Sequence, residues 1–80
     1  MEVIVYSADS CIYCKKQRDF LERQGIDFVE KDIRKSKDSL NEFKELEGKG
    51  TPLTIIKEDD EIVTKITGFN HKQLVQVLQL

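Results

Sequence analysis

The stretch VIVYSADSCIYC, residues 3–14, decides the fold of this chain. Its first four residues are β-branched or aromatic and nearly all apolar, which is typical of a strand buried on both faces of a sheet. Polar, turn-like residues fill positions 7–10. Cys11 and Cys14 then stand at the start of a run of good helix formers that extends to Gln24. The sequence therefore predicts a buried strand that leads directly into a helix with a dithiol at its start.

The next segments complete a strand–helix–strand unit. The predicted helix over 11–24 ends at Gly25, a residue that favours helix termination. Residues 26–30 begin with an alternation of apolar and polar residues, which is typical of a strand. Short connections make this a right-handed crossover unit, so the first two strands should be parallel.

A second helix should run over about 38–47, with apolar residues on one side and with Gly48 and Gly50 ending it. Its start has two candidates. Ser39, with a glutamate three residues on, has capping-box spacing, and Ser36 is a rival N-cap one turn earlier.

Residues 53–56 and 62–66 read as a third and a fourth strand, and the acidic tip 58–61 between them is short enough for an antiparallel hairpin. The last helix begins after Asn70, a favoured N-cap. Phe69 occupies the position before the cap from which a hydrophobic staple is formed. The order βαβ-α-ββ-α predicts an α/β fold in which a four-stranded mixed sheet is flanked by three helices on both of its faces.

Composition narrows the function. Eighty residues fit one domain spanning 1–80, and a net charge of −2 provides no basic field for nucleic acid or an anionic membrane. No signal peptide or membrane span is visible. We therefore expect a soluble protein of a reducing cytoplasm, where a close cysteine pair is catalytic or metal-binding rather than a structural disulfide.

A dithiol at a helix start has distinctive chemistry. Free backbone N–H groups and the positive end of the helix dipole stabilise a thiolate on Cys11, and only the thiolate attacks a disulfide. Lys15, Lys16 and Arg18 add positive potential. Spacing of three residues places Cys14 one turn on, close enough to close a disulfide with Cys11. We assign Cys11 as the attacking thiolate and Cys14, on the apolar stripe of the helix, as the resolving thiol.

The cysteine pair has two alternative interpretations. A lone CxxC can be half of a zinc site, but with His71 as the only histidine a four-ligand site within one chain is incomplete, so we expect no metal. A coincidental pair of small buried residues is disfavoured by its place after a buried strand. A CxxC beside a βαβ pattern is the thioredoxin-like redox signal.

Two further motifs lie later in the chain. Thr51-Pro52 opens an interior strand, where proline is unusual, and the ordinary interpretation is a trans proline at the first residue of that strand. Gly68-Phe69-Asn70 reads as a tight turn, a staple and a cap. Gly68 and Phe69 could also line a groove beside the cysteines. His71 should be an exposed first-turn residue without a catalytic role.

Taken together, residues 3–6, the Cys11-Ile12-Tyr13-Cys14 motif, Thr51-Pro52 and Gly68-Phe69 resemble the glutaredoxin family of the thioredoxin-like superfamily over essentially the whole chain. The resemblance implies a thioredoxin-like fold with the first and third strands central and a cis bond before Pro52. It also implies that a substrate thiol segment pairs with the backbone of Thr51, with Cys11 as nucleophile, Tyr13 beside the groove and Gly68 near the bound thiol compound.

The departures from the family pattern concern the electron donor. Many glutaredoxins have proline after the first cysteine and lysine three residues before it, where this chain has Ile12 and Ala8. Gly68-Phe69 is instead similar to NrdH-type redoxins, which take electrons from thioredoxin reductase and feed ribonucleotide reductase. Asn70-His71 does not match the basic residue and proline that usually follow there. The donor is therefore glutathione, as a co-substrate, or thioredoxin reductase.

The function that we predict is a dithiol–disulfide oxidoreductase acting on protein or glutathione mixed disulfides, as a monomer and without a tightly bound cofactor. The alternative from another class is a dimer that bridges an iron–sulfur cluster through Cys11 of each chain with glutathione thiols as further ligands. The bulk of Ile12 and the absence of a lysine at Ala8 both disfavour it.

Overall fold

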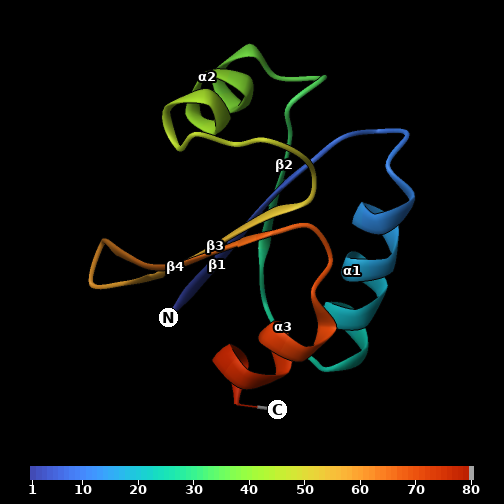
Figure 1. The fold of residues 1–80 in the computed structure, drawn as a ribbon, viewed down its shortest axis with the longest axis vertical. Coiled ribbons are helices and arrows are strands. Elements are labelled where there is room, and N and C mark those ends of the chain that lie inside the picture. The colour runs from blue at the N-terminus through green and yellow to red at the C-terminus, as the bar shows by residue number, and fades with distance from the viewer. Residues whose placement is uncertain (80) are drawn as a thin grey trace.

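The computed structural model describes residues 1–79, which contain four strands and three helices (Figure 1). None of these helices has the length and apolar character that a bilayer-crossing segment needs. The elements follow the predicted order βαβ-α-ββ-α: β1 (Glu2–Ser7), α1 (Ile12–Arg23), β2 (Val29–Asp32), α2 (Lys37–Glu45), β3 (Leu53–Glu58), β4 (Glu61–Thr67) and α3 (His71–Leu78).

The strands form one mixed sheet in the order β2-β1-β3-β4. β1 pairs parallel with β2, as the short crossover through α1 requires, and antiparallel with β3, which in turn pairs antiparallel with β4. The first and third strands are therefore central, as the resemblance implied. The expected α/β, thioredoxin-like architecture is confirmed.

β1 is buried on both faces because its apolar residues serve two separate cores. Val3 and Val5 face α1 and α3, whereas Ile4 and Tyr6 face α2. Figure 1 shows α1 and α3 on one side of the sheet and α2 on the other. The buried residues of the α1/α3 face are Val3, Val5, Leu21, Ile56, Ile66, Leu74 and Leu78, and those of the α2 face are Ile4, Tyr6, Phe43, Leu53 and Ile55.

The ends of α1 and the start of α3 follow the predicted signals. Cys11 is the N-cap of α1, and Gly25 adopts a left-handed φ of 68° just after that helix. Asn70 caps α3, with its side-chain oxygen accepting the N–H of Gln73 at 3.0 Å. Phe69, directly before the cap, packs against the core that contains Leu74.

The second strand starts later than its sequence pattern indicates. The apolar alternation predicts a strand over 26–30, but pairing with β1 begins at Val29 and runs to Asp32. Ile26 and Phe28 are half-buried against the α1/α3 core before the chain joins the sheet. Burial by packing produces the same alternation as burial in a strand, so the pattern misplaced the boundary.

α2 begins close to its predicted start and ends two residues before its predicted end. It starts at Lys37, one residue before the predicted start, and of the two N-cap candidates it uses Ser36, whose Oγ accepts the N–H of Ser39 at 3.2 Å. At the other end the left-handed residue is Glu47, with φ 59°, and not a glycine. Gly48 is needed for a different reason, since a Cβ there would lie 2.5 Å from the ring of Phe43.

Candidate active site

Cys11 lies where the loop after β1 enters α1. Its N–H donates to the carbonyl of Ala8 at 3.1 Å, which closes the turn that aims the side chain at the start of the helix. The Cys11 sulfur accepts the N–H of Cys14 at 3.1 Å, so it serves as the helix N-cap. The Cys11 thiol also approaches the carbonyl oxygen of Thr51 at 3.6 Å, a residue 40 positions away in the chain.

The surroundings of Cys11 favour its thiolate. Partial burial is the largest single influence on the pKa of this thiol and acts to raise it. Hydrogen bonds with the Cys14 and Thr51 side chains, and with the backbone N–H groups of Cys14 and Tyr13, together outweigh burial, so the pKa lies below its ordinary value. Because thiolates are the reactive form, Cys11 is the more nucleophilic of the two sulfurs near neutral pH.

The environment of Cys14 favours the neutral thiol instead. It is a free thiol like Cys11, but only 1% of it is exposed, on the face of α1 that packs on the sheet. Burial, followed by the hydrogen bond with Cys11, raises the pKa of the Cys14 thiol to about 11. The two thiols therefore differ in environment: Cys11 is half-exposed and has a lowered pKa, whereas Cys14 is buried and has a raised pKa.

Thr51 contacts Cys11, and the next residue, Pro52, is in turn bonded to Gly68 from the end of β4. The Thr51–Pro52 peptide bond is cis, as the resemblance implied, and Pro52 is buried. The N–H of Gly68 donates to the carbonyl of Pro52 at 2.8 Å, and Gly68 adopts a φ of 78° that favours glycine. This bond ties the end of β4 to the start of β3 at the edge where Cys11 lies.

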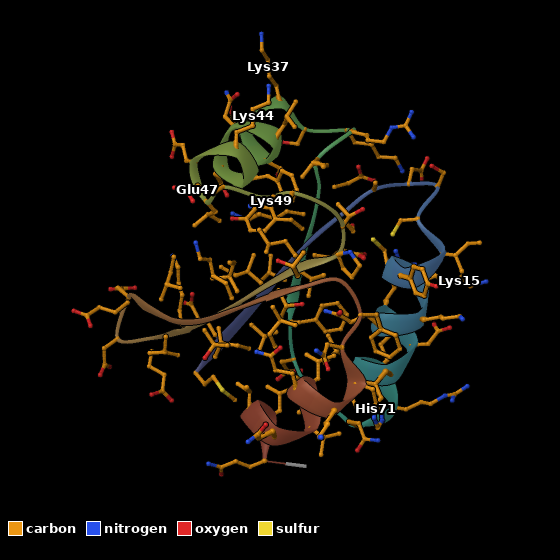
Figure 2. All side chains as sticks on the ribbon, in the orientation of Figure 1. Lys15, Lys37, Lys44, Glu47, Lys49 and His71 are labelled. Atoms are coloured by element: carbon orange, nitrogen blue, oxygen red, sulfur yellow. The ribbon has the colours of Figure 1, made fainter. Side chains whose placement is uncertain are left out.

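Tyr13 and Phe69 occupy different environments. Tyr13 is 59% exposed, with the Lys16 ammonium 5.4 Å from its ring centroid, so it stands free beside Cys11. Phe69 is half-buried, and its ring packs 6.1 Å from that of Phe20 on α1. The contacts that the structure gives Phe69 are thus those of a staple. His71 is exposed and packs edge-on against Phe20 at 4.8 Å, with its position beside α1 visible in Figure 2.

A buried polar pair beneath the dithiol was not predicted. Gln17 and Thr54 are each 0% exposed, and the Gln17 side-chain amide donates to the Thr54 hydroxyl across the gap between α1 and β3. The Gln17 side-chain oxygen has no hydrogen-bond partner among the described residues. The available signal was that Gln17 occupies a position of the α1 stripe where an apolar residue would be expected, one turn after Cys14.

The surface beside Cys11 is an open hollow lined by Asp9, Ser10, Cys11, Ile12, Lys15 and Arg18. Two side-chain interactions fix residues that line this hollow. Arg34 donates a hydrogen bond to the Ser10 hydroxyl at 3.1 Å, and Arg18 forms a bidentate ion pair with Glu30. Sequence reasoning did not single out Arg34, which reaches this site from the loop after β2. A shallow, open site of this kind suits a thiol or disulfide carried by another molecule.

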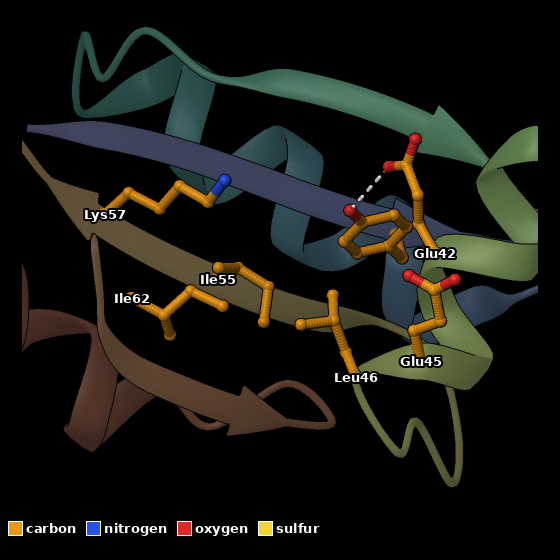
Figure 3. Close-up of a pocket in the computed structure, with 7 residues that line it drawn as sticks. Glu42, Glu45, Leu46, Ile55, Lys57 and Ile62 are labelled. Carbon is orange, nitrogen blue, oxygen red and sulfur yellow. Dashed lines mark hydrogen bonds between the residues drawn. The ribbon is translucent and has the colours of Figure 1, made fainter. Parts of the chain in front are cut away.

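A separate hollow of about 200 Å³ lies on the α2 side of the sheet (Figure 3). Tyr6, Glu42 and Lys57 contribute polar groups to its lining, and Leu46, Ile55 and Ile62 are apolar. It contains neither cysteine, so the cysteine chemistry belongs to the hollow beside α1.

Comparison with known proteins agrees with this geometry. The glutaredoxin family profile matches residues 3–62. The chain belongs to the glutaredoxin family. A glutaredoxin-like 8.6 kDa protein of the rubredoxin operon of Clostridium pasteurianum, itself uncharacterised, is 28% identical over 75 residues, covering 94% of this chain and 95% of that protein.

Solved structures of glutaredoxins and redoxins superpose closely on this glutaredoxin-family chain. The glutaredoxin of Methanosarcina mazei has a TM-score of 0.80 at 27% identity, with 99% of this chain and 79% of that one covered. The NrdH-redoxin of Escherichia coli, described as glutaredoxin-like with a thioredoxin-like activity profile, has a TM-score of 0.79 at 17% identity, with 96% and 95% covered. At that identity the second likeness concerns the fold alone.

Proposed function

We propose that this chain is a dithiol–disulfide oxidoreductase that reduces protein or glutathione mixed disulfides through Cys11 and Cys14. The observation that carries the proposal is the Cys11 sulfur at the start of α1, 3.1 Å from the Cys14 N–H, with a lowered pKa beside a buried thiol whose pKa is raised to about 11. This asymmetry gives one sulfur the attacking role and the other the second step.

In the first step the Cys11 thiolate attacks one sulfur of a substrate disulfide. The bond between Cys11 and that sulfur forms as the substrate S–S bond breaks, and the second substrate sulfur leaves as a thiolate that takes up a proton. Tyr13 and Gly68 flank the incoming segment, and the backbone of Thr51 pairs with it. The chain is then joined to the substrate by a mixed disulfide.

In the second step Cys14 gives its proton to solvent and its thiolate attacks the Cys11 sulfur, releasing the remaining substrate thiolate. Burial is the main cause of the raised Cys14 pKa, and the hydrogen bond and charge of Cys11 add to it. Once Cys11 is in a mixed disulfide, its negative charge is gone, so the two contributions of Cys11 that raise the Cys14 pKa are removed and burial alone holds it up. After this step Cys11 and Cys14 are joined in a disulfide, and the chain has been oxidised by two electrons.

Serine variants at the two cysteines test this assignment. Cys11→Ser should abolish turnover of a disulfide substrate, whereas Cys14→Ser should accumulate the mixed disulfide, measured as the mass of the chain plus one substrate half. Each variant is the matched control for the other, because both remove one thiol from the same helix. Retention of disulfide reductase activity by Cys11→Ser would refute the assignment.

The electron donor is proposed to be glutathione or thioredoxin reductase, and different features of the chain favour each of them. The family match favours glutathione, whereas Gly68-Phe69 and the absence of a lysine at Ala8 favour an NrdH-type redoxin that supplies ribonucleotide reductase. One disulfide substrate should be assayed with glutathione and glutathione reductase, and then with thioredoxin reductase alone. Turnover in only the first assay supports a glutaredoxin, and turnover in only the second supports the redoxin.

We further propose that the chain works as a monomer in a reducing cytoplasm and needs no tightly bound cofactor. Catalysis of disulfide reduction requires that the Cys11–Cys14 pair be returned to the dithiol after each cycle. Rapid acid quenching of cells, followed by alkylation and mass spectrometry, should find the pair mostly reduced. A pair found mostly oxidised in resting cells would contradict this location.

A further inference from the structure

The two ends of the sheet carry different segments because of the strand order. Register places Ser7 of β1 beside Asp32 of β2, and Leu53 of β3 beside both Tyr6 and Thr67. The loops that follow β1 and β2 and the loop that precedes β3 therefore all meet at the edge where Cys11 lies. The β3–β4 turn lies at the opposite edge and projects away from the start of α1 in Figure 1.

These two edges differ sharply in charge. The segments 8–18, 33–37 and 46–51 at the Cys11 edge hold seven Lys or Arg residues against two Asp or Glu residues. The segment 57–61 at the opposite edge holds one lysine and four acidic residues. A chain with a net charge of only −2 thus has a basic reactive edge and an acidic far edge, and such a separation orients a charged partner during approach.

Several cations at the Cys11 edge remain available to a partner. Arg18 is held by Glu30 and Lys35 lies 3.6 Å from Asp9, but no ion pair within residues 1–79 engages Lys15 or Lys49, and both are exposed. Figure 2 shows Lys15 projecting from the start of α1 away from the fold. We define the basic rim as Lys15, Lys16, Arg34 and Lys49.

An exposed apolar centre lies next to the reactive sulfur, at the same edge as the basic rim. Ile12 is 71% exposed and Tyr13 is 59% exposed, and both adjoin Cys11. Ile12 and Lys15 also line the hollow that contains Cys11. An apolar centre with a charged rim is the usual composition of a protein–protein contact surface, in which the centre provides affinity and the rim provides orientation.

We propose that this edge docks a protein segment in which the disulfide is flanked by acidic residues, and that the basic rim makes the chain prefer such disulfides over those flanked by basic residues. The proposal rests on the proposed function, since it concerns the substrate of the same Cys11 thiolate. The acidic β3–β4 turn adds to the preference by repelling the partner from the wrong edge.

The experiment compares three short peptide disulfides of the same length, flanked by glutamate, by lysine or by uncharged residues. Reduced chain is mixed with each peptide, and the second-order rate of its oxidation is measured by acid quench and mass spectrometry, so no electron donor is needed. At low salt the glutamate peptide should react at least about tenfold faster than the lysine peptide. At 1 M salt, where screening acts over about 3 Å, the ratio should approach one.

Charge-reversal variants locate the effect. Lys15→Glu and Lys49→Glu should each reduce the glutamate-to-lysine rate ratio several-fold, and the double variant should abolish it. The ratio cancels any change in the pKa of Cys11, which affects all three peptides equally. Lys72→Glu, the same charge change at an exposed residue of α3, is the matched control and should leave the ratio near that of the unmodified chain.

The outcomes separate this inference from the proposed function. A ratio near one for the unmodified chain at low salt, or a ratio unaffected by the double variant, would overturn the basic-rim preference while leaving the disulfide chemistry intact. Failure of the uncharged peptide to oxidise the chain would instead refute the proposed function, and the preference with it.

Discussion

The two faces of the sheet are covered to different extents. α1 and α3 together seal one face, where Leu21, Leu74 and Ile66 are exposed by 1% or less. On the other face α2 covers only part of the sheet, so Ile62 is 43% exposed and the hollow of Figure 3 opens between the helix and β3. On this face the Tyr6 hydroxyl donates to Glu42 of α2 at 2.9 Å.

The two faces therefore differ in their relation to the cysteine site. The helix that carries the dithiol lies on the sealed face, so the position of Cys14 is fixed by tight packing around it. The α2 face is more open and bears no part of the cysteine site. We therefore expect substitutions on the sealed face to have larger effects on stability than comparable substitutions on the α2 face.

The largest expected difference in the free energy of unfolding is between alanine variants of two leucines, one on each face. Leu74→Ala removes a side chain that is 0% exposed on the sealed face, and should lower the free energy of unfolding by about 2–5 kcal/mol. Leu46→Ala, at a half-buried residue of the α2 face, should cost only about 1 kcal/mol. Urea denaturation of both variants measures the difference. Equal costs would show that the two faces are packed alike.

The next contrast concerns the buried polar pair. Thr54→Val removes the hydroxyl that accepts from Gln17 and leaves a fully buried amide unpaired, at a cost of about 1–3 kcal/mol. Adding Gln17→Met should recover much of that loss, because removing both partners leaves no unsatisfied donor. Urea denaturation of the single and double variants checks this. A double variant less stable than Thr54→Val would mean that the amide is satisfied elsewhere.

On the α2 face the corresponding change is Tyr6→Phe, with an expected cost of about 0.5–1.5 kcal/mol at neutral pH. Burial, followed by the bond to Glu42, raises the pKa of Tyr6 from 10.0 to about 12. The stabilisation is therefore fully present below pH 10, where the unfolded tyrosine would begin to ionise, and is lost as the pH rises to about 12.

Stability curves between pH 8 and 12 should thus fall more steeply for the unmodified chain than for Tyr6→Phe. Tyr13→Phe is a matched control, because Tyr13 is exposed and donates no hydrogen bond to a residue in the described part of the chain. Parallel alkaline losses in the unmodified chain and Tyr6→Phe would contradict the role of Tyr6.

The smallest effect is expected where α2 meets β4. The Lys65 ammonium donates to the carbonyl of Leu46 at 3.2 Å, at the C-terminal end of α2. Lys65→Met keeps the length of the side chain but removes this charge, and should cost about 0.3–1 kcal/mol. The loss should shrink at high salt, which urea denaturation with and without 1 M sodium chloride can measure.

Local signals predicted those parts of the fold that depend on neighbours in sequence. The run 3–6, the cap at Asn70 and the stop at Gly25 all depend on residues within one or two turns, and all are confirmed. The start of β2 depends on the partner strand, and the burial of Gln17 depends on Thr54, 37 residues away. Local periodicity does not identify the partner in either of these tertiary contacts.

The candidate site likewise combines features that depend on local sequence with features that depend on tertiary contacts. The proximity of Cys11 and Cys14 follows from a spacing of three in a helix, and the different exposure of the two thiols follows from the apolar stripe. The approach of Thr51 to Cys11 spans 40 residues and was expected only from the family resemblance. Arg34 reaches the site from the loop after β2 and had no local signal at all.

The Cys11 sulfur has two tasks at once, since the atom proposed to react is also the acceptor that holds the Cys14 N–H at 3.1 Å. A thiolate is a much stronger acceptor than a sulfur engaged in a disulfide. Any reaction that ties up Cys11 therefore weakens the cap, and the first turn of α1 opens more readily to solvent. The Cys14 amide is consequently a built-in reporter, and its hydrogen-exchange rate records the oxidation state of the neighbouring sulfur.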